Sequence, residues 1–126
     1  MNFMPAERAG DGWQVTGTDL VLPGFGQLAT GADALTLGLR PEHIEVLPAD
    51  AAANDPWAFD ATVKLAELLG ADALLNLSVK GQPLLARVGG TDFPQAGETV
   101  RIRVDPARLH AFDPETELTV ARAAQH

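Results

Sequence analysis

Two segments of the chain share one alternation of apolar and polar residues. Residues 35–44 (LTLGLRPEHI) and 100–109 (VRIRVDPARL) both read apolar-x-apolar-x-apolar-x-Pro-x-x-apolar, and their prolines, Pro41 and Pro106, lie 65 residues apart. Alternation with a period of two predicts a strand with one buried face. Proline then fixes φ and removes an amide donor, so the strand ends and a turn begins. The repeat therefore predicts a small duplicated β-barrel in which two related units pack together.

Further short strands are expected along the chain. The window 64–69 could also form a helix, but Gly70 follows after few residues and the next segment alternates again, which favours a strand. The apolar positions of this long segment are expected to alternate with polar ones: Phe59, Ala61, Val63 and Leu65. The predicted strands cover residues 13–16, 19–22, 35–39, 44–47, 59–69, 74–79, 84–88, 100–104 and 110–113, with one helical turn at 107–109. About ten short strands in a chain of this length are typical of barrels and sandwiches, so the predicted fold class is all-β.

A polar, alanine-rich loop over residues 48–56 is the predicted boundary between the two units. The first unit then covers about residues 1–50 and the second about 57–120. Residues 121–126 are expected to form a frayed end, because chain termini are poorly ordered unless something holds them.

Composition and charge exclude several classes of protein. The chain has 126 residues, 46% of them apolar, and no cysteine. It has no apolar run long enough to span a bilayer and no secretory signal, so an intracellular protein is expected. Nine basic residues face seventeen acidic ones, for a net charge of −8, which argues against binding to nucleic acid phosphates. Trp13 and Trp57 lie far apart and tyrosine is absent, so no aromatic stripe is available for stacking bases.

Catalytic chemistry is sparse. Gly24-Phe25-Gly26 and Gly89-Gly90-Thr91 lack the lysine and the helix of a phosphate-binding loop and read as turns. The three histidines, His43, His110 and His126, have no metal-ligand spacing. His43 and His110 nearly correspond across the repeat, which favours a structural role in the turns. The sequence therefore predicts no enzyme activity and no metal or cofactor site in this chain.

The segment Gly38-Leu39-Arg40-Pro41-Glu42-His43-Ile44 resembles the Gly-x-Arg-Pro-Glu-His signature of a known family. That family is the C-terminal regulatory region of the ATP-binding subunits of ABC importers of the maltose and glycerol-phosphate type. The resemblance covers about residues 1–120. Its other matching segments are Met1–Met4, Val63 with Glu67-Leu68-x-Gly70, Arg87, Gly97–Val100 and Leu109–Asp113.

The resemblance implies a transport-associated OB domain made of two intertwined OB-like β-barrels. It implies a domain that regulates and dimerises an importer ATPase, with ATP and magnesium bound in an ATPase domain that lies outside this chain. The expected partners are a second copy, the ATPase domain of the same subunit, the membrane permeases indirectly, and a cytosolic regulator, but no nucleic acid. The expected location is the cytoplasm, at the inner face of the cell membrane.

The candidate interface or regulatory residues are Arg40, Pro41, Glu42, His43, Glu67, Gly70, Arg87, His110, Phe112 and Asp113. Arg40 and Glu42 either point into solvent beside a turn or form a polar cluster with His43 at a contact surface. Glu67 and Arg87 are expected to pair if they lie on adjacent strands.

Two functions remain open at this stage. A dimerisation module needs an exposed apolar patch, for which Leu68, Leu69, Phe93 and Phe112 are candidates, although such residues more often belong to the core. The alternative is a small-ligand binder that holds an oxyanion or a sugar. Its donors could come from Thr91 beside Gly89-Gly90, or from Ser78-Val79-Lys80.

Overall fold

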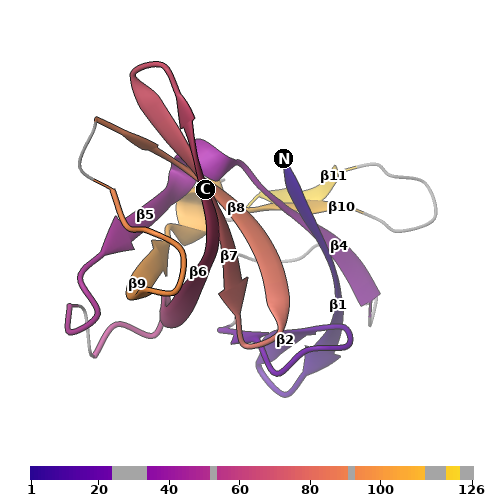
Figure 1. The fold of residues 1–126 in the computed structure, drawn as a ribbon. Helices are drawn as coiled ribbons and strands as arrows, with labels where there is room; N and C mark the ends of the chain where they lie inside the picture. The colour runs from indigo at the N-terminus through magenta and orange to yellow at the C-terminus, as the bar shows by residue number, and fades with distance from the viewer. Residues whose placement is uncertain (24–33, 52–53, 91–92, 113–118, 123–126) are drawn as a thin grey trace.

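Two antiparallel sheets make up the part of the chain that a computed structural model describes, residues 1–23, 34–51, 54–90, 93–112 and 119–122 (Figure 1). Within these residues the only helical segments are two 3-10 turns, η1 and η2, so the all-β prediction is confirmed. The elements are β1 Asn2–Ala9, β2 Gly12–Val15, β3 Val21–Leu22, β4 Ala34–Leu39, η1 Pro41–His43, β5 Ile44–Leu47, β6 Ala58–Leu69, β7 Asp72–Val79, β8 Gln82–Gly89, β9 Thr99–Val104, η2 Pro106–Arg108, β10 His110–Phe112 and β11 Thr119–Arg122.

The two sheets have the same internal order. The six-stranded sheet runs β11-β10-β4-β1-β2-β3 and the five-stranded sheet runs β5-β9-β6-β7-β8. Aligning the two orders pairs β10 with β5, β4 with β9, β1 with β6, β2 with β7 and β3 with β8, and leaves β11 as an extra edge strand. The duplication predicted from the sequence is therefore present in the topology.

Each repeat contributes strands to both sheets. β5 follows β4 through the turn η1, yet it pairs with β9 in the other sheet. β10 follows β9 through the turn η2, yet it pairs with β4 in the first sheet. This exchange is the intertwined arrangement that the family resemblance implies.

Proline sets the geometry of both connecting turns. Pro41 and Pro106 each occupy the first position of a 3-10 turn, where a missing N–H costs nothing and a fixed φ suits the turn. In each turn the N–H of the third residue donates to the carbonyl that precedes the proline, at 3.0 and 2.9 Å. Asp105 also accepts a hydrogen bond from the N–H of Ala107, whereas the side chain of Arg40 makes no such cap.

One apolar core lies between the sheets, and the repeat supplies equivalent positions to it. Alternate residues of β4 and β9 are almost completely buried: Leu35, Leu37 and Leu39, and Val100, Ile102 and Val104. Trp13 and Trp57 are also buried in this core. Burying one face of each strand fixes its register, because a slip by one residue would turn the apolar side chains to solvent.

The prediction that Leu65 continues the buried alternation of β6 is wrong. Val63 lies opposite Leu77, but Leu65 lies opposite Asn76, so Lys64 is an extra residue that forms a β-bulge. The bulge shifts the phase of the strand by one residue, and Leu65 is 49% exposed.

Two strands were not expected from the sequence. β1 begins at Asn2, although its segment NFMPAERA has a proline and no β-branched residue. β11 covers residues 119–122, where the sequence predicts a frayed end from residue 121.

Candidate functional site

The turn η1 and strand β8 bring together four of the candidate residues: Arg40, Glu42, His43 and Arg87. The pKa of Glu42 is lowered, first by a hydrogen bond from its own backbone N–H and then by the charges of His43, Arg40 and Arg87. Glu42 is therefore a carboxylate at neutral pH. Arg40 and Glu42 both lie exposed on the surface, and the charges near Glu42 come from the other three residues.

His43 faces its counterpart in the other repeat, which is Arg108 and not His110. The two residues are 65 positions apart, and Nη1 of Arg108 lies 3.4 Å from Nε2 of His43. Because a guanidinium can only donate, Nε2 of His43 would be the acceptor of a hydrogen bond in this contact. Nδ1 is buried and has no hydrogen-bond partner among the described residues.

The predicted pair between Glu67 and Arg87 is wrong. Glu67 on β6 and Arg87 on β8 both lie opposite Leu74 of β7, so a whole strand separates them. Two strand spacings amount to about 10 Å, too far for an ion pair. Arg87 instead donates from Nε to Asp72 Oδ2 at 2.8 Å.

The β6–β7 hairpin ends in a turn at Gly70, and Figure 1 shows it projecting beyond the rest of its sheet. Gly70 has a φ of +73°, a conformation that other residues rarely adopt. Beside it, Leu68 is 62% exposed and Leu69 is 44% exposed. These two predicted patch residues are indeed on the surface, whereas Phe93 is half-buried against the core.

A second apolar surface lies on the outer side of the six-stranded sheet. We call it the aromatic face and define it as Met1, Phe3, Gly38, His110 and Phe112. The ring centroids of Phe3 and Phe112 are 6.3 Å apart, and His110 stacks on Phe112 at 6.1 Å. Phe3 is 59% exposed and Met1 is 44% exposed.

The glycine of the signature has a steric role in this face. A Cβ atom on Gly38 would lie 2.7 Å from Met1 Sδ and 2.9 Å from Phe112 Cε2. Only glycine therefore lets these side chains pack directly over β4. Asp113, the remaining candidate residue of this region, lies outside the described residues, as does Thr91.

A family model described as "TOBE domain" matches residues 37–112. The chain belongs to the TOBE domain family. The matched part of this TOBE domain runs from β4 to β10, so it includes both proline turns and both exchanged strands.

Curated relatives extend the similarity to almost the whole chain. Proteins named sn-glycerol-3-phosphate import ATP-binding protein UgpC are 35% identical in Cereibacter sphaeroides, 36% in Ruegeria sp. and 37% in Ralstonia nicotianae. These matches cover 92%, 96% and 92% of the TOBE domain, but 31%, 32% and 33% of the relatives. The chain thus spans about a third of their length.

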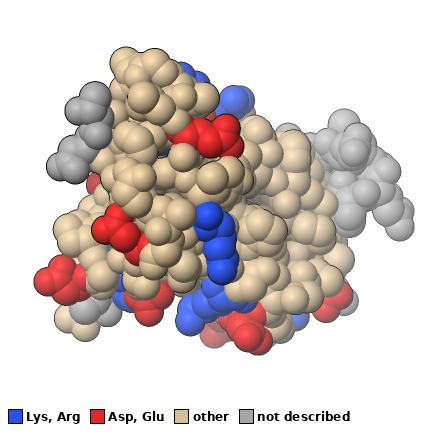
Figure 2. All heavy atoms as spheres, viewed as in Figure 1, with Lys and Arg blue, Asp and Glu red and all other residues tan. Residues whose placement is uncertain are grey.

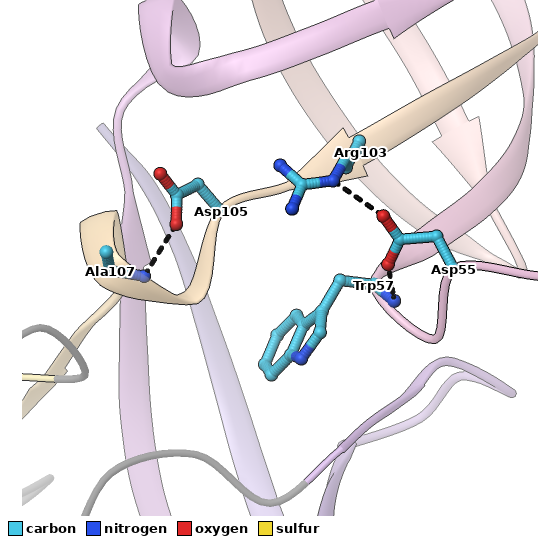
Figure 3. A network of polar contacts seen from close by, with 5 residues as sticks. All are labelled: Asp55, Trp57, Arg103, Asp105 and Ala107. Carbon is cyan, nitrogen blue, oxygen red and sulfur yellow. Dashed lines mark hydrogen bonds and ion pairs between the residues drawn. The ribbon is translucent and has the colours of Figure 1, made fainter. Parts of the chain in front are cut away.

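Polar contacts fix the start of the second repeat in this TOBE domain (Figure 3). Asp55 accepts hydrogen bonds from the N–H of Trp57 at 2.8 Å and from Nε of Arg103 at 2.6 Å. These two donors lower the pKa of Asp55, and the same contact raises the pKa of Arg103. The result is that β6 begins next to β9, with Trp57 turned into the core.

Asn2 joins the two sheets, a role that sequence reasoning missed. Its side-chain N–H groups donate to the carbonyls of Leu85 at 2.9 Å and Leu39 at 3.2 Å. Its Oδ1 accepts from the N–H of Leu85 at 2.8 Å. The carboxamide thus bonds the outer edge of β8 as a neighbouring strand would, and Pro83 offers no N–H on that edge. The resemblance at Met1–Met4 pointed to this position but not to its bonds.

No helix among the described residues is long and apolar enough to cross a membrane.

Proposed function

We propose that this TOBE domain is the C-terminal regulatory and dimerisation module of the ATP-binding subunit of an ABC importer. The observation that carries the proposal is the 35–37% identity to import ATP-binding proteins over more than nine tenths of the chain. The solute would be a sugar or a related compound. The first candidate is sn-glycerol 3-phosphate, because the relatives are named for it. The transport step itself belongs to the rest of the transporter.

The partners follow from this role. The domain would contact a second copy of the subunit and the ATPase domain of the same subunit. Through the ATPase domain it would be linked to the membrane permeases. Its location would be the cytoplasm, at the inner face of the membrane. A cytosolic regulator could bind the exposed faces. ATP and magnesium would bind in the ATPase domain, so the TOBE domain itself needs no cofactor, binds no nucleic acid and catalyses no reaction.

We assign the dimer contact to the aromatic face. Phe3 and Met1 are exposed apolar side chains that pack beside Phe112, and exposed aromatic clusters are favourable centres for protein contacts. The exchange of β5 and β10 connects this face to the other sheet. The polar cluster of Arg40, Glu42 and Arg87 would then offer charged groups to a regulator, since the arginine fork suits a carboxylate.

Sedimentation of the whole subunit, with and without this domain, tests the proposal. We expect the intact subunit to dimerise without nucleotide and the truncated subunit to remain a monomer. In the intact subunit, Phe3→Ser should weaken the dimer, whereas Leu68→Ser, an equally exposed apolar residue at the hairpin tip, should not. Equal dimerisation of the truncated subunit, together with an isolated domain that stays monomeric, would refute the dimerisation role. Loss of the dimer in the Leu68 variant alone would place the contact on the hairpin tip instead.

A further inference from the structure

An open groove of about 520 Å³ lies on the outer face of the five-stranded sheet, over β6, β7 and β8. Its volume is in the range of small-molecule sites. Pro83 and Leu85, which lie opposite Ser78 and Asn76 on the neighbouring strand, also line the groove, as does Asn2. Figure 2 shows this side of the molecule, where Lys and Arg side chains form a band in the middle and Asp and Glu lie around it.

Three polar side chains in the groove have no partner among the described residues. Lys64, Asn76 and Ser78 line it, and none of them makes a hydrogen bond or an ion pair with another described residue. Asn76 and Ser78 both face outward from β7, because Leu75 and Leu77 face the core. Lys64, the extra residue of the bulge in β6, also lines the groove, next to Leu65, which lies opposite Asn76. By contrast, the amide of Asn2 is fully used by Leu85 and Leu39.

The charge of the groove differs from that of the whole chain. The net charge of the protein is −8, yet no Asp or Glu is among the described residues that line the groove. Lys64 is one of only two lysines in the sequence. Three of the arginines, Arg87, Arg101 and Arg103, are already paired with aspartates. A free ammonium without nearby carboxylates in the groove favours an anionic group.

We propose that this groove binds a small polyol that carries a phosphate or a carboxylate. Lys64 contacts the anionic group, while the Asn76 amide and the Ser78 hydroxyl bond hydroxyl groups. Asn76 and Ser78 lie two residues apart on one strand, a separation of about 7 Å. An inorganic phosphate ion is too small to bridge that distance, whereas a polyol chain of several carbons reaches both side chains. The apolar side chains of Pro83 and Leu85 cover the carbon backbone of the ligand.

NMR titration of the isotope-labelled chain tests the proposal directly. The probes are glucose 6-phosphate and gluconate, with glucose and inorganic phosphate as the separate fragments. We expect saturable shifts at the amides of Lys64, Asn76 and Ser78 with one or both anionic sugars, and weaker binding of either fragment. Comparing the affinities for glucose 6-phosphate and gluconate shows whether the groove binds the phosphate or the carboxylate more tightly.

The two lysines provide a matched pair of variants. Lys64→Met should weaken binding about 10- to 100-fold, the usual worth of a hydrogen bond to a charged group. Lys80→Met removes the same charge from the neighbouring turn and should change affinity by less than about twofold, as expected for a screened surface charge. Ser78→Ala should weaken binding several-fold without altering the bulge.

Two results would overturn the proposal. One is the absence of saturable shifts at these three residues with every probe. The other is an equal loss of affinity in the Lys64 and Lys80 variants, which would mean attraction by net charge without a site. The outcome is independent of dimerisation, so it does not depend on the function proposed above.

Discussion

Removing the carboxamide of Asn2 should destabilise the domain more than any other substitution of a polar side chain near the surface. Asn2 is 9% exposed and makes three hydrogen bonds, at 2.8, 2.9 and 3.2 Å, to backbone groups of Leu85 and Leu39. Asn2→Ala deletes all three and leaves the N–H and carbonyl of Leu85 without partners at the edge of β8.

The size of the effect follows from these bonds. Each hydrogen bond contributes about 0.5–1.5 kcal/mol net, and water can replace part of the bonding to Leu85 in the variant. The free energy of unfolding should therefore fall by about 2–3 kcal/mol. For a chain of this length, each kcal/mol lowers Tm by about 3–5 °C, so Tm should fall by about 6–15 °C.

Urea denaturation and amide hydrogen exchange measure this prediction. The free energy of unfolding should fall by the stated amount, and the Leu85 amide should exchange faster than its neighbours on β8. Gln14→Ala is the matched control, because the amide of Gln14 makes a single exposed hydrogen bond to Thr18 and its loss should cost less than about 0.5 kcal/mol. If Asn2→Ala changed stability no more than Gln14→Ala and left Leu85 protected, Asn2 would not join the sheets in solution.

Four further measurements address other features. Gly12→Ala would push a Cβ atom into the backbone carbonyl of Leu22 and should lower the free energy of unfolding by about 1–3 kcal/mol in a denaturation assay. At Gly38 the new Cβ atom would meet only side chains, which can move, so Gly38→Ala should lower it less. Leu75→Ala, at a fully buried site, should lower the free energy of unfolding by about 2–5 kcal/mol. Leu68→Ala, at an exposed site, should lower it by less than about 0.5 kcal/mol. Equal losses in the two variants would contradict the described core. Because the pKa of Asp55 is lowered in the folded state, its carboxylate stabilises the fold at pH values above the ordinary pKa of 3.8. This stabilisation disappears as the pH falls through the folded-state pKa. Asp55→Asn should therefore be less stable than the native chain at pH 7, and the difference should vanish in acid. Fragments 1–51 and 54–126 should each fail to fold alone, because each lacks the strand that the other supplies, but should give a native circular dichroism spectrum when mixed.

The sequence alone determined the local elements of the repeat. The repeat around Pro41 and Pro106 located two strands and two turns, because alternation and proline act within a few residues and need no partner. The signature from Gly38 to Ile44 pointed to the family that the comparisons then showed. It also named Arg40, Glu42 and His43, and another segment of the same resemblance named Arg87; the structure brings these four residues together.

Only the tertiary structure decided which strands lie side by side. The strand order places β7 between Glu67 and Arg87, so a plausible ion pair does not form. A single extra residue at Lys64 reverses the phase of β6 and exposes Leu65, which no alternation pattern could reveal. Asn2 bonds to Leu85, 83 residues further along the chain. Strand pairing is governed by backbone groups that every residue carries, so the choice of partner depends on how the whole core closes and not on the local sequence.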